Sequence, residues 1–257
     1  KVYDPSDKRW VEIWNDVFME YYKNDKGEYA KAKQKNVDTG MGLERTVAAL
    51  NNFSDAYQVD AMLPLIKKIE KLSDKKYLEN DEVTKSMRII ADHLRAATMI
   101  IGDKRGVPPS NVDQGYVVRR LIRRSVRKGR QLGIKDNFCA EVAQVVIDIF
   151  KNIYLEIEKN KDFVLREISA EEEKFSVALG KGMKEFRNII EARINDKIVS
   201  RVLSPHSVFT LYTTYGFPIE LIVEMAKENE FDIDLVAFEN DMKKHQDLSR
   251  VGAEQKF

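Results

Sequence analysis

The sequence has 257 residues, of which 43% are hydrophobic and 33% charged, with a formal net charge of +1. This is enough apolar material for one large domain or two small ones. No run approaches the roughly 18 apolar residues that a bilayer-crossing helix needs. Residues 1–10 carry no secretory signal, so we expect a cytoplasmic protein with no membrane partner. A single cysteine excludes an internal disulfide, and three scattered histidines predict no metal site.

Two short strands are expected first. Residues 10–22 are rich in aromatic and β-branched side chains, and residues 28–37 return as a more polar strand after the turn signal at residues 24–27. Two strands are not stable alone, so helices of this chain or a sheet outside it must cover them.

Helices fill the rest of the chain. After Gly42 the apolar spacing becomes helical. Pro205 after Ser204 and the possible N-cap Asp234 favour helix starts there, and Gly216 favours a helix end. The further helices are expected at about residues 55–72, 82–101, 114–132, 136–159, 161–194, 205–215, 218–229 and 234–249. The predicted fold class is therefore mainly α: a small antiparallel β/α part, followed by an all-helical domain.

A glycine turn joins the second strand to the first helix. The string Val-Asp-Thr-Gly-Met-Gly-Leu-Glu-Arg at residues 37–45 lets the backbone approach a ligand closely and offers the N–H groups of a helix start to a phosphate. Arg45, in the first helical turn, could bind a phosphate with two bonds. A short Gly-x-Gly turn beside a surface arginine is the plainer interpretation of such a pattern alone.

The longer string resembles motif 3 of the class II aminoacyl-tRNA synthetases, in the form found in alanyl-tRNA synthetases. Four further strings, in the same order and at similar spacing, are similar to that family: Glu-Ile-Trp-Asn at residues 12–15, Ile-Ala-Asp-His-Leu-Arg at 90–95, Pro-Ser-Asn with the arginine pairs that follow at 109–124, and the segment from Leu211 to Pro218.

The resemblance implies a role for each matching residue. Asp38 would hold the ammonium group of alanine, and Asn15 would bind the other end of the amino acid or its adenylate. Gly40 and Gly42 would let the backbone lie against ATP, and Arg45 would neutralise its phosphates as pyrophosphate leaves. For Asn15, a strand amide that satisfies only a neighbouring backbone group is the competing interpretation.

The resemblance also implies the domain organisation and the partners. Residues 1–75 would be the end of the catalytic domain, and residues 76–257 the helical domain that recognises the acceptor stem of tRNA(Ala). The family uses alanine, ATP and Mg²⁺, and binds tRNA, not DNA. Motifs 1 and 2 are not found and the first residue is not methionine. We therefore expect part of a longer ligase that cannot activate alanine alone.

A strongly basic helix is the sharpest feature that needs no resemblance. Between residues 88 and 135 there are 12 Lys and Arg against 3 Asp, a net +9. At about 100° per residue, one half of the helix carries Arg119, Arg120, Arg123, Arg124, Arg127 and Lys128. No acid occurs between residues 116 and 134, so pairs within the helix are excluded. A bound phosphate backbone favours such a face, whereas acids from another helix are the alternative explanation.

Two residues are candidates for reading RNA identity. By resemblance, Asn111 would contact a G·U pair, the third of the acceptor stem, in the accessible minor groove of A-form RNA. A turn role after Pro109-Ser110 suits an asparagine equally well. The second residue that contacts the G·U pair in the family is an aspartate, and this sequence has Thr213 at that position. Threonine lacks the charge, so we do not expect this protein to depend strictly on the wobble pair.

Two other functions compete with the ligase. One is a free-standing RNA-binding helical module without catalysis, which would have no use for Asp38 and Arg45 beside the glycine turn. The other is a helical structural protein whose basic face is incidental. Loss of RNA affinity with rising salt separates the last from the others.

Overall fold

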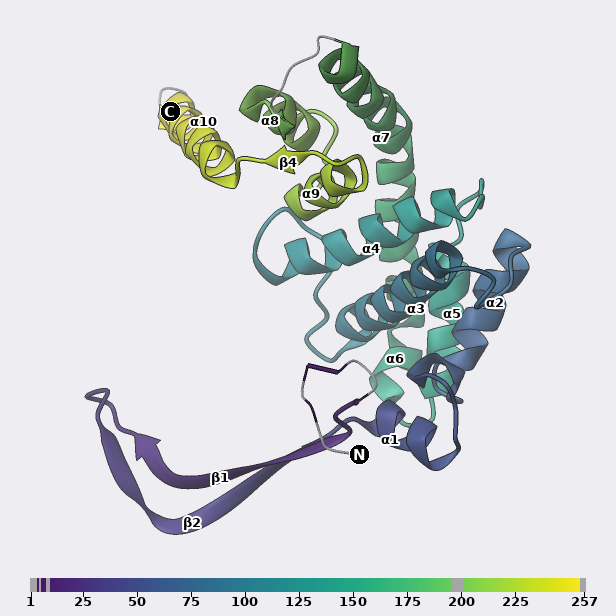
Figure 1. Ribbon diagram of the computed structural model, residues 1–257, viewed down its shortest axis with the longest axis vertical. Coiled ribbons are helices and arrows are strands. Elements are labelled where there is room, and N and C mark those ends of the chain that lie inside the picture. The colour runs from purple at the N-terminus through teal and green to yellow at the C-terminus, as the bar shows by residue number, and fades with distance from the viewer. Residues whose placement is uncertain (1–3, 5, 8–9, 196–200, 255–257) are drawn as a thin grey trace. The chain divides into compact units, whose positions relative to one another are not determined.

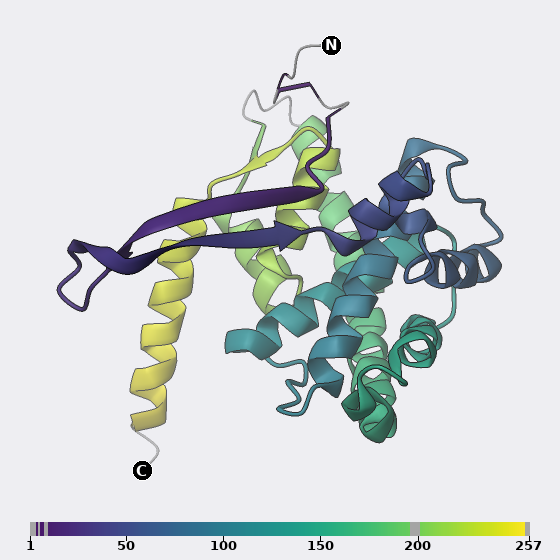
Figure 2. The same ribbon diagram turned by 90° about the horizontal axis from the view of Figure 1, so that it is seen from below.

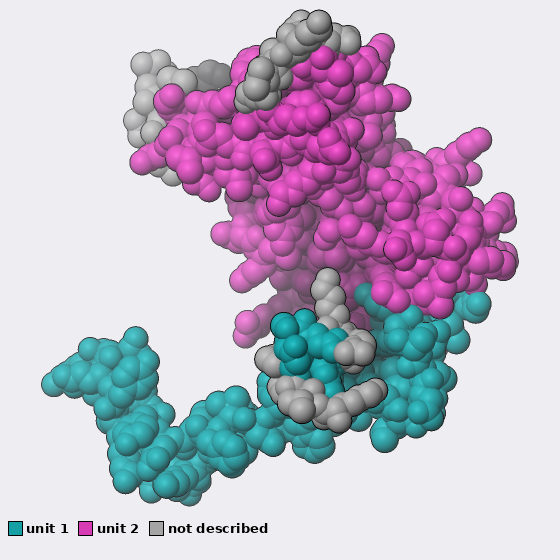
Figure 3. All heavy atoms as spheres, in the orientation of Figure 1, with its two compact units in different colours: residues 1–67 teal, residues 68–257 magenta. Residues whose placement is uncertain are grey.

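The computed structural model describes residues 4, 6–7, 10–195 and 201–254, and the chain divides into two compact units, residues 1–67 and 68–257 (Figure 3). The division falls inside α2 (Leu63–Ser73), whereas the sequence suggested a boundary after residue 75. The positions of the two units relative to each other are not determined, so each is described by itself.

The first unit is a long hairpin followed by a short helix (Figures 1 and 2). Strands β1 (Trp14–Lys23) and β2 (Tyr29–Met41) pair antiparallel, with a register shift between Met19 and Tyr21. Helix α1 (Leu43–Leu50) begins at once after Gly42. The two predicted strands and the change to helix after the glycine turn are confirmed. The helix expected at 55–72 is divided, because a short 3₁₀ turn (Ala56–Gln58) comes before α2.

The second unit is helical. Its helices are α3 (Asp81–Gly102), α4 (Asp113–Gln131), α5 (Cys139–Phe150), α6 (Leu155–Lys159), α7 (Lys161–Asn195), α8 (Pro205–Thr213), α9 (Ile219–Glu228) and α10 (Leu235–Glu254). Helix α3 packs against α4, α5 and α7, and α8 packs against α7, α9 and α10. None of the described helices is long and apolar enough to cross a membrane.

The helix boundaries follow local chemistry. Asn80 accepts a hydrogen bond from the Val83 N–H at 2.9 Å and caps α3, and Ser204 caps α8 by accepting from the Ser207 N–H at 3.1 Å. The Asp234 carboxylate accepts from the Ala237 N–H at 2.9 Å, as predicted for an N-cap. The mainly α prediction is confirmed, with two further differences of detail in the second unit.

The first difference is that the helix expected at 136–159 is two helices, α5 and α6. The second is a parallel pair of two-residue strands, β3 (Val202–Leu203) and β4 (Asp232–Ile233), which was not predicted. A two-residue strand is too short to show an alternating pattern, so only the folded chain reveals it.

The long helix α7 packs closely against the turn between α8 and α9 at a glycine. Phe217, in the turn between α8 and α9, is buried and meets Phe175 of α7 edge to face, with ring centroids 5.6 Å apart. A Cβ on Gly182 would lie 2.0 Å from the Phe217 ring. Gly182 is therefore required for the packing that anchors this turn.

We predict that Gly182→Ala destabilises the fold by about 1–3 kcal/mol, because the added methyl group overpacks a buried ring. A Cβ on Gly180, two residues earlier on the same helix, would meet nothing within 4 Å. Gly180→Ala should therefore be neutral or stabilise by roughly 0.5–1 kcal/mol through helix propensity. Urea unfolding of both variants measures the difference, and equal destabilisation by the two would contradict the packing argument.

Candidate functional site

The hairpin presents Asn15, Asp38 and Gly40 on one face. Asn15 lies opposite Gly40 in the register, and Val17 lies opposite Asp38. Paired residues of an antiparallel hairpin share a face, as do residues two apart on one strand. The residues expected to hold alanine and the nucleotide are thus neighbours, and both polar side chains are exposed.

The glycine turn places Arg45 close to the hairpin. A Cβ on Gly40 would meet the Asn15 Oδ1 at 3.1 Å, and one on Gly42 would meet the Arg45 side chain at 3.3 Å. The Arg45 guanidinium donates through Nη1 to the Glu12 carbonyl oxygen at 3.0 Å, and Asn15 donates through Nδ2 to the Glu12 carboxylate at 3.2 Å. The glycines therefore leave room for the side chains of Asn15 and Arg45, which both donate hydrogen bonds to Glu12.

The opposite face of the hairpin carries four exposed apolar side chains on either side of the polar pair Asp16 and Thr39. The side chains of Trp14, Phe18, Val37 and Met41 are on this face by register, and Phe18 is 82% exposed. Exposed apolar side chains grouped on a sheet face normally pack against another sheet or helix layer. This agrees with the expectation that the strands need a cover.

The basic face of α4 differs from the prediction. Arg123, Arg127 and Lys128 are only 2%, 4% and 3% exposed, and the face is lined by carboxylates of α7 and α9. The expectation of an open cationic surface is therefore wrong for these three residues. Burying an unpaired charge is costly, so the partners must come from other helices, as the competing interpretation proposed.

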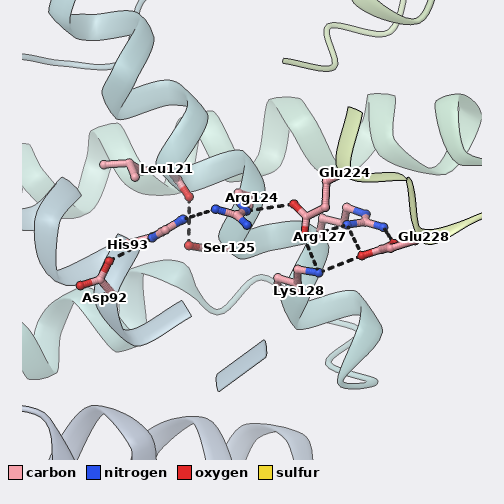
Figure 4. A network of polar contacts seen from close by, with 9 residues as sticks. All are labelled: Asp92, His93, Leu121, Arg124, Ser125, Arg127, Lys128, Glu224 and Glu228. Atoms are coloured by element: carbon pink, nitrogen blue, oxygen red, sulfur yellow. Dashed lines mark hydrogen bonds and ion pairs between the residues drawn. The ribbon is translucent and has the colours of Figure 1, made fainter. Parts of the chain in front are cut away.

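Helix α9 supplies most of these carboxylate partners, because its acidic residues have the same spacing along the chain as the cations on α4. Its acids recur every four residues, and so do the cations of α4 that face them, which aligns two rows of side chains. Figure 4 shows part of the resulting network. The pairs are Arg120–Glu220, Arg124–Glu224 at 3.0 Å, Lys128–Glu224 at 2.8 Å, Lys128–Glu228 at 3.3 Å and Arg127–Glu228.

The network reaches α3 through a histidine (Figure 4). The Arg124 guanidinium lies 3.2 Å from the His93 Nε2 and can only donate, so the proton of a neutral His93 is on Nδ1, which faces Asp92 at 3.3 Å. The hydrogen bond with His93 holds the pKa of Asp92 below its usual value, against burial. Burial would raise the pKa of Glu224, but Lys128 and Arg124 outweigh it, and the pKa is lowered.

Glu171 of α7 pairs with the other edge of the basic face. One of its oxygens accepts from the Arg123 Nε and lies 3.5 Å from the Arg119 Nε. Arg123 also donates to the Gly216 carbonyl oxygen, and its guanidinium carbon lies 4.9 Å from the centre of the Phe175 ring. Burial lowers the pKa of Arg123, and Glu171 opposes this shift. The pair thus fastens the turn after α8 to α4.

The two residues that were predicted to recognise a base pair of the acceptor stem line the same cavity. A hollow of about 300 Å³ is lined by Asn111, Arg119 and Thr213, together with Tyr116, Tyr212 and His245. Asn111 and Thr213 are both exposed, and they come from segments about a hundred residues apart in the chain. The Thr213 hydroxyl donates to the Phe209 carbonyl oxygen at 2.8 Å, so its oxygen remains as an acceptor.

Sequence reasoning missed the residues that shape this cavity and the basic face. It assigned no role to Glu171, Tyr116, His245 or the acids of α9. The four-residue spacing of Glu220, Glu224 and Glu228 was a visible signal, since it matches the spacing of the cations on α4. Glu171 had no such signal, because only the path of α7 brings it to Arg123. Among the described residues, no group of three His, Cys, Asp or Glu side chains could hold a metal ion.

We predict that Glu171→Ala destabilises the fold by about 3–5 kcal/mol, because it leaves the Arg123 guanidinium buried without its carboxylate. Glu167 is one turn earlier on α7 and pairs with Arg166 at 3.5 Å on the surface. Glu167→Ala should change stability by less than about 1 kcal/mol. Chemical unfolding of both variants tests this, and a loss below about 1 kcal/mol for Glu171→Ala would show that the pair is not a structural constraint.

Comparison with known proteins agrees with the resemblance in the sequence. The chain is 45% identical to the alanine–tRNA ligase of Borreliella afzelii (strain PKo) over 249 residues, which cover 97% of this chain and 41% of that protein. It is 43% identical to the alanine–tRNA ligase of Treponema pallidum (strain Nichols) over the same shares. It is 41% identical to that of Pediococcus pentosaceus (strain ATCC 25745 / CCUG 21536 / LMG 10740 / 183-1w), over 95% of this chain and 27% of the relative.

The chain thus spans less than half the length of these relatives. A family model described as tRNA synthetases class II (A) matches residues 2–257, which is nearly all of the sequence. The motifs at residues 12–15 and 37–45 and the basic helix lie within this match. The chain belongs to the class II (A) family of tRNA synthetases.

Proposed function

We propose that this chain contributes two parts of an alanine–tRNA ligase: the motif 3 turn, which binds ATP and alanine, and the helical surface that recognises the acceptor stem of tRNA(Ala). The cavity where Asn111 and Thr213 meet supports the second part most directly, since two predicted readers from distant segments share it. In the cytoplasm, such a ligase forms alanyl-adenylate from alanine and ATP and then transfers alanine to the 3′ end of the tRNA.

The polar face of the hairpin supports the role in activation. The carboxylate of alanine attacks the α-phosphate of ATP, an alanyl–phosphate bond forms, and pyrophosphate leaves. Asp38 would bind the ammonium group and Asn15 the carboxyl end, while Arg45 would neutralise the phosphates. Gly40 leaves room for the Asn15 side chain, because a Cβ at Gly40 would crowd it, and the glycine backbone would lie against the nucleotide.

Mg²⁺ would accompany ATP rather than bind to a site of this chain. Asp38 is a single carboxylate on the polar face, and no group of metal-binding side chains occurs among the described residues. Mg²⁺ commonly binds through one or two carboxylates, several waters and the phosphates of the substrate. The chain's own contribution would be to hold alanine and the phosphates of the nucleotide.

The acceptor-stem role is narrower than the sequence suggested. Arg120 and Arg124 have side chains that are 36% exposed and Arg119 one that is 17% exposed, so these can reach a phosphate or a base. Arg123, Arg127 and Lys128 instead stabilise the contacts of α4 with α7 and α9. Because phosphate contacts set position and base contacts set identity, Arg120 and Arg124 would position the stem and Asn111 and Thr213 would read it.

A free-standing RNA-binding module without catalysis remains the second candidate. The exposed arginines and the cavity would serve it equally well. It gives no reason for Asp38, Asn15 and Gly40 to share one face beside Arg45, which favours the ligase.

We predict that the chain binds an RNA minihelix of the tRNA(Ala) acceptor stem with an affinity that falls as salt rises. Arg120→Met should weaken binding of all stem sequences several-fold and reduce the slope of log K against log salt by about 0.7–0.9, as for one lost phosphate contact. Arg166, with a side chain 65% exposed on α7, provides the matched control, and Arg166→Met should change neither quantity. Affinity independent of salt, or equal effects of both variants, would contradict the proposal.

We predict that Thr213→Asp increases the preference for a G·U over a G·C third pair by roughly 5- to 100-fold. A carboxylate accepts from the guanine 2-amino group more strongly than a hydroxyl does, since the bond is charge-assisted. The effect is measured by binding minihelices that differ only in this pair to the unchanged chain, to Thr213→Asp and to Thr213→Val, which removes the hydroxyl. If neither substitution changes the ratio of affinities, Thr213 does not read the pair.

A further inference from the structure

The loop that carries Asn111 is fastened to the start of α4. Ser110 donates through its backbone N–H to the Gly115 carbonyl oxygen at 3.0 Å and through its hydroxyl to the Val112 carbonyl oxygen at 2.8 Å. A Cβ on Gly115 would lie 2.3 Å from the Ser110 hydroxyl oxygen, so the loop fits tightly over this glycine. The backbone at Asn111 is thus held in place, although its side chain is exposed.

A guanidinium two turns along α4 determines which way the Asn111 side chain faces. The Arg119 Nη1 donates to the Asn111 Oδ1. Arginine has donors but no acceptor, so the amide atom that faces it must be the oxygen. The Nδ2 group, with its two N–H donors, then points to the other side. Asn111 therefore presents donors to a ligand in the cavity that it lines with Arg119 and Thr213.

Arg119 is itself held by Glu171. The Arg119 Nε lies 3.5 Å from the Glu171 carboxylate, whose same oxygen accepts from Arg123. Arg123 in turn donates to the Gly216 carbonyl oxygen, three residues after Thr213. One buried carboxylate therefore connects the loop of Asn111 with the turn that follows Thr213.

We infer that Arg119 is a positioning residue for base-pair recognition, which it serves by orienting the Asn111 carboxamide rather than by binding phosphate. This inference rests on the proposed function. Asn111 then donates through Nδ2, while Thr213, whose proton goes to the Phe209 carbonyl oxygen, accepts. The donor and the acceptor together fit a minor-groove edge that offers both an acceptor and an amino group. Only pairs that contain guanine offer that amino group, whereas A·U pairs do not.

The first experiment observes the Asn111 side chain without RNA. The NMR signals of its Nδ2 group in the full chain are assigned by their loss in Asn111→Ala. Arg119→Met keeps the alkyl stem, removes the donors and leaves the Arg123–Glu171 pair intact. It should move these signals toward the values of a mobile amide, and Arg120→Met, the neighbouring control, should leave them unchanged. Unchanged signals in Arg119→Met would overturn the inference, whatever the RNA binding.

The second experiment measures coupling between the two residues. Arg119→Met should reduce the preference for a minihelix with a guanine-containing third pair over one with A·U by about tenfold, the order of one base-edge contact. In the Asn111→Ala background it should have no further effect, and the salt slope should stay the same. If the two substitutions have additive effects on this preference, or if Arg119→Met reduces the slope of log K against log salt by about 0.7–0.9, Arg119 binds RNA directly. Either result would overturn the inference.

The two experiments separate the inference from the proposed function. A chain that binds no minihelix refutes the acceptor-stem proposal, and the NMR signals still decide whether Arg119 orients Asn111. If Arg119→Met does not fold, Arg119→Lys replaces it. A lysine ammonium cannot bridge both Glu171 and Asn111 with the planar geometry of arginine, so the Nδ2 signals should shift in the same direction.

Discussion

The buried carboxylate of Glu171 is the constraint on which the geometry of the cavity lined by Asn111 and Thr213 depends. Its oxygen meets Arg119 and Arg123, whose charges would otherwise be buried or half-buried on α4 without a partner. Desolvating a guanidinium costs several kcal/mol, and a carboxylate in good geometry offsets this cost. The same contact fixes geometry, because Arg123 reaches the Gly216 carbonyl oxygen and Arg119 reaches Asn111. A single carboxylate inside the helical unit, paired with two arginines, thus connects two loops that lie far apart in the sequence.

The acids of α9 have a related but different effect. Glu220, Glu224 and Glu228 lie along the side of α4 that faces α9, and they neutralise a row of cations that would repel one another at four-residue spacing. The network excludes Arg127 and Lys128 from solvent but leaves Arg120 and Arg124 about one-third exposed. Under the proposed function, an RNA phosphate would compete with Glu220 and Glu224 for these two arginines. The ion pairs would hold the arginine side chains in place before RNA binds, and breaking them would lower the net gain from each phosphate contact.

The sequence predicted the elements of the fold better than it predicted their contacts. Strands, the glycine turn and most helices follow from periodicity, Ser and Asp caps, and glycine or proline at the ends, all of which are local signals. The resemblance to the family likewise depended on short strings, and the comparisons confirm it. The burial of Arg123 could not be predicted in the same way, because Glu171 is 48 residues away along the chain. An arginine-rich helix with no acid of its own looks like an RNA surface until the tertiary partners are known.

The burial of Arg123, Arg127 and Lys128 limits the number of cations on α4 that can reach an RNA phosphate. If six free cations bound the stem, phosphate contacts would dominate affinity, and any RNA helix of similar shape would satisfy them. With three of these cations buried against protein carboxylates, fewer sequence-independent contacts would remain, so under the proposed function a larger share of discrimination would come from the cavity lined by Asn111 and Thr213. Thr213 provides one neutral acceptor where an aspartate would provide a charged one. Under the proposed function, the orientation of Asn111 would therefore be decisive, since a wrongly turned carboxamide would remove one of the two groups that distinguish a base pair.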